Sequence, residues 1–196
     1  MRAMTERRRA KIETVLRHRQ KGLTLVMDNV WDPHNVSAIY RSCDAFGVPE
    51  VHLYYTQCAF PQLSRKTSAS AFKWVNTIRH SGKEELMEAL HAQNMQVLAT
   101  SCSPASRPVT DYDFTKPTAI IMGNEHAGVS SELVSLADGE VYIPMYGMVQ
   151  SFNVSVASAL MLAEASRQRS LAGMYDTLLW SEEEYAVRLN AWLEKA

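Results

Sequence analysis

Short apolar runs alternate with segments of helical periodicity along most of the chain. The runs expected to form strands are residues 23–30, 50–55, 96–102, 118–123 and 140–144. The segments expected to form helices are residues 35–46, 83–94, 130–137 and 153–173. Strands that alternate with helices in this way form mainly parallel sheets with helices on both faces. The pattern therefore predicts an α/β fold.

A further helix is expected at each end of the chain. Thr5 can cap a helix that runs to about Gln20, and its narrow apolar stripe predicts weak docking that leaves its arginines free. The last helix opens with a capping box from Ser181 to Glu184, and its apolar side must pack on the body or on a second copy.

These elements divide the chain into a basic N-terminal helix (1–22), a central domain (23–175) and a C-terminal helical extension (176–196). Within the central domain, residues 56–82 are rich in serine, threonine and basic side chains. We interpret this segment as a connection between strands.

The composition is that of an ordinary globular protein, with 46% apolar and 21% charged residues in a chain of 196. No apolar run approaches the roughly 20 residues of a membrane span, and the N-terminus lacks the apolar middle of a secretory signal. We expect a cytoplasmic protein. Its three cysteines are widely separated and have no zinc-ligand spacing, so neither a disulfide framework nor a metal site is expected.

Charge is distributed unevenly along the chain, although the net formal charge is only −1. The first 21 residues carry eight basic and two acidic side chains, a net charge of +6. Such a basic segment on a nearly neutral body favours a polyanionic partner, and the alternative interpretation is a solvated helix face.

The loops that follow the strands exclude two common kinds of nucleotide site. The loop 28–35 contains no glycine, which excludes the Gly-rich turn of dinucleotide-binding folds. The loop 123–130 has glycines at phosphate-loop spacing, but Val129 stands where the phosphate-binding lysine is required. This loop can still offer backbone donors and one carboxylate to a ligand, or it is only a polar turn that caps the next helix.

Two side chains of the helix 35–46 are informative. Arg41 is expected to face away from the core, because it lies about 150° from the centre of the apolar stripe of this helix. Asn35 is most simply explained as an N-cap. Taken alone, neither residue indicates a function.

Three segments together resemble the ordered motifs of a known family. The segments NVSAIYRS, IIMGNEHAGV and IPMYGMVQSFNVSVASAL are similar to those of the SpoU/TrmH branch of the SPOUT RNA 2′-O-methyltransferases, and the resemblance covers about residues 23–175. It implies a C-terminal trefoil knot, a homodimer and S-adenosylmethionine as cofactor. Within the branch, the tRNA guanosine-2′-O-methyltransferases that modify the D-loop guanosine at tRNA position 18 are most similar. The alternatives are a ribosomal RNA 2′-O-methyltransferase of the same fold and a catalytically inactive RNA-binding relative.

The resemblance also implies roles for individual residues. Those at the positions of the catalytic motifs are Asn35, Arg41, Glu125, Ser151 and Asn153. Those at the positions of the cofactor loops are Thr100, Gly123, Ile143, Met145 and Phe152, the last of which replaces the leucine usual in the family. From their charge we expect RNA contacts from Arg7, Arg8, Arg9, Lys11, Arg17, Arg19, Arg65 and Lys66.

Arg41 raises a chemical difficulty. The resemblance assigns it as the base that activates the ribose 2′-hydroxyl, but the pKa of a guanidinium lies above about 12 and the group stays protonated. As a cation it can instead clamp a phosphate and stabilise a developing alkoxide. The sequence therefore predicts an essential Arg41 and leaves the proton acceptor open.

Overall fold

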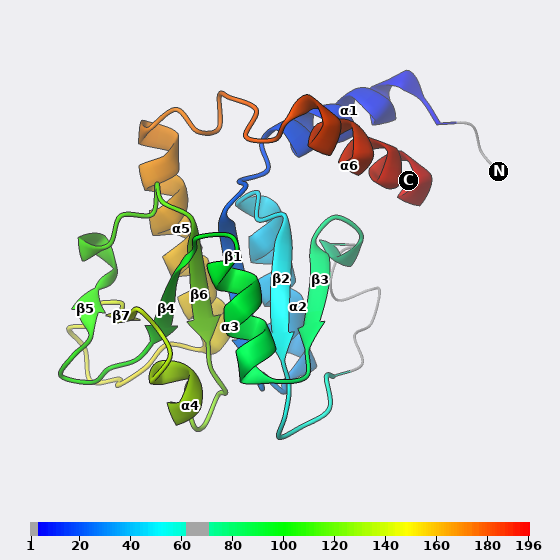
Figure 1. Ribbon diagram of the computed structural model, residues 1–196. Coiled ribbons are helices and arrows are strands. Elements are labelled where there is room, and N and C mark those ends of the chain that lie inside the picture. The colour runs from blue at the N-terminus through cyan, green and yellow to red at the C-terminus, as the bar shows by residue number, and fades with distance from the viewer. Residues whose placement is uncertain (1–3, 62–70) are drawn as a thin grey trace.

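A computed structural model of the chain describes residues 4–61 and 71–196. Its strands form one sheet, in which every neighbouring pair is parallel and the order is β3-β2-β1-β6-β4-β7-β5 (Figure 1). The strands are β1 (Leu23–Asp28), β2 (Glu50–Tyr54), β3 (Asn76–His80), β4 (Gln96–Thr100), β5 (Arg107–Pro108), β6 (Thr118–Met122) and β7 (Gly139–Tyr142). The predicted α/β fold is confirmed.

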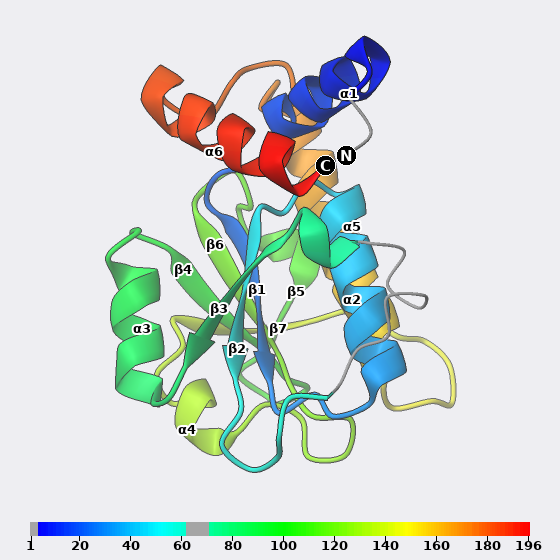
Figure 2. The same cartoon turned by 90° about the vertical axis from the view of Figure 1, so that its right-hand side faces the viewer.

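Helices cover both faces of the sheet, as Figure 2 shows. One face carries α2 (Pro33–Ala45) and α5 (Val154–Leu171), and the other carries α3 (Lys83–His91) and α4 (Ser131–Val134). Each face has its own apolar core, because β-strand side chains alternate between the two sides of the sheet. The chain also forms two short 3₁₀ helices, η1 (Ala71–Lys73) and η2 (Val109–Asp111).

Several elements differ from the prediction. The strand β3 lies inside the segment interpreted as a connection, and its sequence NTIRH lacks an apolar run because it is the edge strand of the sheet. The helix α4 is a single turn, so it is shorter than the predicted 130–137. The helix α2 begins earlier than predicted and is capped by Asp32, whose carboxylate accepts a hydrogen bond from the His34 amide at 2.8 Å. The N-cap interpretation of Asn35 was therefore wrong.

The terminal helices α1 (Glu6–Arg17) and α6 (Glu182–Lys195) pack against each other beyond the amino ends of the strands (Figure 1). Ile12 and Leu16 of α1 form an apolar cluster with Trp192 of α6. The Thr5 cap and the Ser181 capping box are both present. The apolar side of α6 thus packs on the N-terminal helix, while the three-part division of the chain stays a prediction, as does the knot.

Arg19 was expected to contact RNA as one of the free arginines, and its position in the structure contradicts this. Its side chain is fully buried, pairs with Asp44 and donates to the Val48 carbonyl at 3.2 Å. Burial lowers the pKa of Arg19, and Asp44 partly opposes this effect. Arg19 therefore ties the end of the N-terminal segment to α2. The remaining predicted basic residues of α1 are exposed, whereas Arg65 and Lys66 lie outside the described residues.

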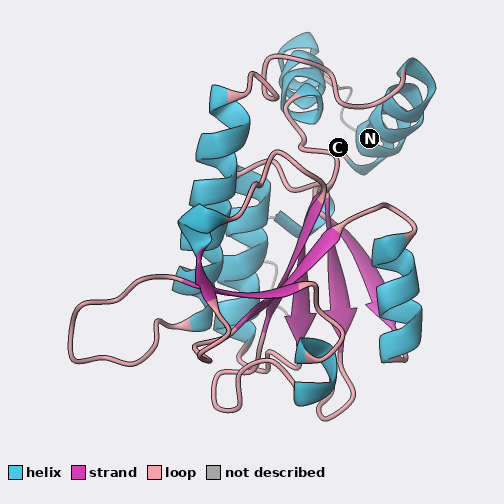
Figure 3. Cartoon of the chain, turned by 60° about the vertical axis from the view of Figure 1, so that its left-hand side comes forward, coloured by secondary structure: helices cyan, strands magenta, loops and turns pink. Residues whose placement is uncertain are grey.

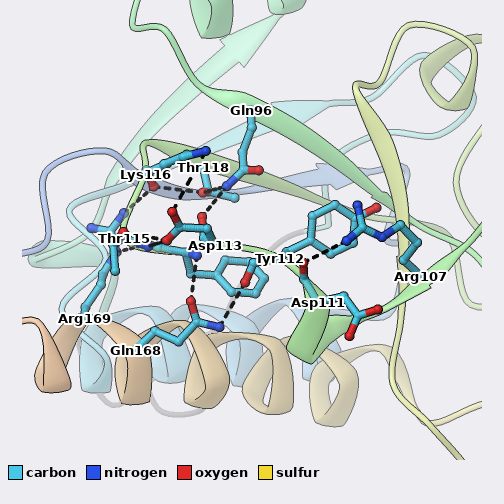
Figure 4. Close-up of polar contacts among 11 residues, drawn as sticks. Gln96, Arg107, Asp111, Tyr112, Asp113, Thr115, Lys116, Thr118, Gln168 and Arg169 are labelled. Atoms are coloured by element: carbon cyan, nitrogen blue, oxygen red, sulfur yellow. Dashed lines mark hydrogen bonds and ion pairs between the residues drawn. The ribbon is translucent and has the colours of Figure 1, made fainter.

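Arg169, near the end of α5, fixes this helix to the amino end of the sheet (Figure 4). Its buried guanidinium donates to the carbonyls of Phe114 (2.8 Å), Lys21 (3.1 Å), Gly22 (2.8 Å) and Lys116 (3.1 Å). Burial lowers the pKa of Arg169 to about 10, so the group remains charged at neutral pH. The neighbouring Gln168 side chain accepts from the Phe114 amide at 2.8 Å, which adds a second tie to the same loop.

Replacing Arg169 by methionine is expected to lower the free energy of unfolding by about 2–4 kcal/mol, because buried carbonyls lose their donors. Urea denaturation at pH 7 measures this change. Arg167→Met is the matched control, because Arg167 is exposed on the same helix and pairs only with Glu164 among the residues described. The control should change stability by less than about 0.5 kcal/mol. Equal stability of both variants would contradict the anchoring role of Arg169.

Among the described residues, no helix has the length and apolar character needed to cross a membrane. The three cysteines are free, and they range from fully buried Cys43 to exposed Cys102.

Candidate active site

A cleft of about 470 Å³ lies at the carboxyl ends of β4, β6 and β7. This is the edge of a parallel sheet where open α/β folds bind ligands. All five residues assigned to the cofactor by the resemblance line it, namely Thr100, Gly123, Ile143, Met145 and Phe152. Glu125, Ser151 and Asn153 line it as well. The fold therefore brings together residues from three segments that are far apart in the sequence.

A hydrogen-bonded network joins the three motifs beside this cleft. The Glu125 carboxylate accepts from the side-chain amide of Asn35 at 3.0 Å and from the Asp32 backbone amide at 3.2 Å. It therefore sits at the amino end of α2, where the helix dipole favours a negative charge. Asn35 in turn accepts from the side-chain amide of Asn153 at 3.0 Å.

The network fixes the orientation of both asparagine side chains. Because the ionised carboxylate of Glu125 can only accept, the amide nitrogen of Asn35 must face it, and the oxygen of Asn35 must face Asn153. The oxygen of Asn153 is then left to accept from the Ser155 amide at 2.9 Å, which caps α5. Glu125 thereby sets the position of the first turns of α2 and α5.

Gly123 lets the loop after β6 turn back on itself. A Cβ at this position would lie 2.0 Å from the carbonyl carbon of Gly128 and 2.1 Å from the nitrogen of Val129. Asn124 and Gly128 also exchange two backbone hydrogen bonds of 2.9 Å. This tight turn presents Glu125 to α2 and forms one wall of the cleft.

Sequence reasoning missed two residues that hold these loops together. Asn29 has a positive φ of 51°, accepts from the backbone amides of residues 56 and 57, and accepts from the Asn124 side chain through its own carbonyl at 2.9 Å. Asp28 accepts from the Ser130 amide at 2.7 Å. The signal that could have found them is a pair of polar residues directly after a buried apolar strand, at the edge where ligands bind.

Arg41 and Ser151 complete the predicted set, and they are placed differently. Ser151 is exposed in the cleft, on the loop between β7 and α5 that stands out from the body in Figure 3. Arg41 is exposed, as expected, but it does not line the cleft of its own chain. It lies on α2 about 9 Å further along the helix axis than Asn35.

The fold and the site define a class of protein. This is an α/β protein with a cleft that has an apolar wall. The carboxylate of Glu125 orders the loops around this cleft. Residues 22–163 match the model of the SpoU rRNA Methylase family. The chain belongs to this family.

Individual relatives agree with this assignment. The tRNA (guanosine(18)-2'-O)-methyltransferase of Thermus thermophilus is 46% identical over 195 residues, with 100% of both chains covered. The Escherichia coli K12 protein of the same name is 46% identical over 176 residues, which cover 88% of this chain and 75% of that one. The solved structure of the A. aeolicus TrmH/SpoU tRNA modifying enzyme superposes with a TM-score of 0.90 at 39% identity, covering 97% of this chain and 96% of that chain.

A further solved structure carries a cofactor. The SpoU methyltransferase AviRb from Streptomyces viridochromogenes, in complex with AdoMet, superposes with a TM-score of 0.68 at 29% identity. The match covers 75% of this chain and 57% of that one.

Replacing Asn35 by aspartate places a second carboxylate beside Glu125 and so tests the contact between these two positions. The new carboxylate would face Glu125 where a 3.0 Å hydrogen bond now exists, and two such groups cannot both ionise easily, so one carboxyl pKa must rise. A carboxyl pKa raised in the folded state makes stability fall as pH increases through that raised value. We expect a loss of about 1–3 kcal/mol at pH 7 relative to wild type that shrinks toward pH 5.

Denaturant unfolding at several pH values measures this effect. The matched control is Asn35→Ala, which removes the same hydrogen bonds without adding a charge. Its difference from wild type should be nearly independent of pH. A pH-independent loss in Asn35→Asp would show that Glu125 does not interact with position 35 in solution.

Proposed function

We propose that this protein is an S-adenosylmethionine-dependent tRNA methyltransferase that methylates the 2′-oxygen of the D-loop guanosine at position 18. The observation that carries the proposal is the single cleft lined by all five predicted cofactor residues, with the Glu125, Asn35 and Asn153 network at its edge. The names of relatives that match this chain over nearly its whole length support the choice of tRNA and of guanosine 18. We therefore propose that the protein acts in the cytoplasm.

The residues of the cleft suit S-adenosylmethionine. The volume of about 470 Å³ falls within the usual range for small-molecule sites. Ile143, Met145 and Phe152 offer an apolar wall for the adenine ring, and the turn at Gly123 lets backbone groups approach the ligand closely. When bound, this cofactor supplies an electrophilic methyl group.

Side chains of the protein then hold the ribose and stabilise the negative charge that develops on its 2′-oxygen. Ser151 is exposed in the cleft and can donate to a ribose or phosphate oxygen. The orientation of Asn153 is set by Asn35, so it can act as a rigid support for the ribose. Arg41, as a permanent cation, clamps a phosphate and stabilises the developing alkoxide. Much of the rate would come from alignment of these groups.

We also propose that the protein acts as a homodimer. Apolar side chains are exposed on the loop between β7 and α5 and on α5 itself, namely Tyr146, Met148, Val149, Phe152, Val156 and Leu160. Several exposed apolar side chains on one loop and the helix that follows it favour a protein partner. Arg41 lies outside the cleft of its own chain, so a second copy on this face offers a way to bring an Arg41 to each cleft. The molecular mass in solution tests this proposal.

One assay tests the proposed activity. The protein is incubated with labelled S-adenosylmethionine and unmodified tRNA or ribosomal RNA, and the methylated nucleotide is then mapped. We expect label at the 2′-oxygen of guanosine 18 of tRNA. Label in ribosomal RNA alone would identify a ribosomal RNA methyltransferase of the same fold. If neither RNA is labelled while tRNA still binds, the protein is an inactive RNA-binding relative.

A further inference from the structure

Two neighbouring hollows lie at the amino end of the sheet, away from the cofactor cleft. They have volumes of about 220 and 400 Å³ and share Trp74 and Trp192. Together they form a groove that is lined by residues of α1, α6 and the segment that contains η1. Figure 1 shows α1 and α6 at the opposite end of the sheet from the carboxyl ends of the strands. We call the groove formed by these two hollows the tryptophan groove.

The tryptophan groove is strongly basic. The smaller hollow is lined by Arg19, Lys73, Arg188 and Lys195, and the described residues that line it include no aspartate or glutamate. The larger hollow adds Arg8 and Lys11. Asp44, which also lines the larger hollow, is already paired with Arg19. The groove therefore concentrates positive charge on a protein whose net charge is −1.

The groove also contains aromatic surface and unused hydrogen-bond donors. Trp74 is partly exposed and packs at 5.0 Å between ring centroids against Trp192. Arg188 lies over the ring of Trp180 at 3.9 Å, and both residues line the smaller hollow. Two buried N–H groups of lining residues, Nε of Arg19 and Nε1 of Trp180, have no acceptor among the described residues. Both atoms are buried, so they belong to the wall of the groove rather than to its open surface.

We propose that the tryptophan groove binds an unpaired nucleotide of the RNA substrate, distinct from the nucleotide that is methylated. Lys73, Lys195 and Arg188 hold its phosphate, and Trp74 offers a face on which its base can stack. Single-stranded nucleic acids are bound by this combination of cationic side chains and aromatic rings. The proposal rests on the proposed function for the identity of the partner as RNA.

The location of the groove constrains the substrate. The central strands have five or six residues, so the two ends of the sheet are about 17–20 Å apart. An RNA that fills the cleft and the groove of one chain must span at least this length. A compact folded RNA can do so, whereas a free nucleotide can occupy only one of the two sites.

The test removes two exposed charges that lie outside the apolar cores, Lys73 and Lys195. For Lys73→Ala combined with Lys195→Ala, we expect the dissociation constant for unmodified tRNA to rise about tenfold at 100 mM salt. The slope of log K against log salt should fall by about one to two, because each phosphate contact contributes about 0.7–0.9. Affinity for S-adenosylmethionine and the melting temperature should stay unchanged. The matched control, Arg107→Ala with Arg167→Ala, removes the same charge from exposed positions that do not line the groove.

A second measurement separates this proposal from the proposed function. Three of the four tryptophans, Trp74, Trp180 and Trp192, line the groove, so its occupancy should change the intrinsic fluorescence. A uridine hexanucleotide, titrated with S-adenosylmethionine present, is expected to quench wild type and to lose about tenfold in affinity for the lysine variant. Equal tRNA affinity of this variant and wild type, or equal loss in the control variant, would overturn the groove proposal even if tRNA is methylated. Quenching without methylation of any RNA would instead count against the proposed function alone.

Discussion

Replacing Arg41 by alanine is expected to lower the methylation rate by about 10²–10³-fold, the usual loss when one group that stabilises a developing oxyanion is removed. Arg41 is exposed on α2 and lies outside the cofactor cleft of its own chain. Folding and S-adenosylmethionine affinity should therefore be preserved. Single-turnover kinetics with unmodified tRNA measure the rate, and calorimetry measures cofactor binding.

Arg41→Lys distinguishes the two roles considered for this side chain. Lysine keeps a positive charge but cannot bind a phosphate bidentately. Substantial turnover with a pH profile of unchanged shape would count against a specific base role for the guanidinium. Arg107→Ala is the control for loss of one exposed arginine, and its rate should be close to that of wild type. An Arg41→Ala protein with normal turnover would exclude Arg41 from the catalytic machinery.

Replacing Gly123 by alanine is expected to weaken S-adenosylmethionine binding by at least about tenfold and to cost about 1–3 kcal/mol of stability. The added methyl group would lie about 2 Å from the backbone of residues 128 and 129, so the turn after β6 must open. Opening the turn would also displace Glu125 from the amino end of α2. Isothermal titration calorimetry and urea unfolding measure the two effects.

Gly82→Ala is the matched control for this variant. A Cβ at position 82 would meet only the Glu84 carboxylate, at an ordinary 3.6 Å, and Gly82 lies before α3 rather than in the cleft. We expect unchanged cofactor affinity and a stability change of at most about 1 kcal/mol. If Gly123→Ala binds the cofactor as tightly as this control does, the turn is not needed for binding.

The fold class was predictable because buried parallel strands are read directly as short apolar runs. The central strands β1 and β6 are buried along their whole length, and both were recognised. The edge strand β3 was missed because only its last residue, His80, is buried and its sequence NTIRH is mostly polar, so its composition resembles that of a loop. The order of strands in the sheet depends on long-range pairing, which local periodicity does not encode.

The candidate site was predictable only in part. Motif positions identified the residues that line the cleft, but only the three-dimensional structure reveals that Asn35 bridges Glu125 and Asn153 rather than capping α2. Charge counting also failed at Arg19, because an arginine that pairs with Asp44 in the folded protein has the same sequence signature as one that faces solvent. Pairing of a charged residue with a partner 25 positions away is a tertiary property.

Arg169 anchors one end of α5, and the other end of this helix lies at the cleft. The helix has 18 residues and is therefore about 27 Å long, with Asn153 at the cleft and Arg169 in the loops at the far end of the sheet. A tilt of only about 5° around the Arg169 anchor would move the cleft end by about 2 Å, and misplacement by 1 Å can already cost about 10²-fold in rate. Substitutions around Arg169, remote from any reacting atom, could thus adapt the enzyme to a different working temperature by changing the angle of a single helix.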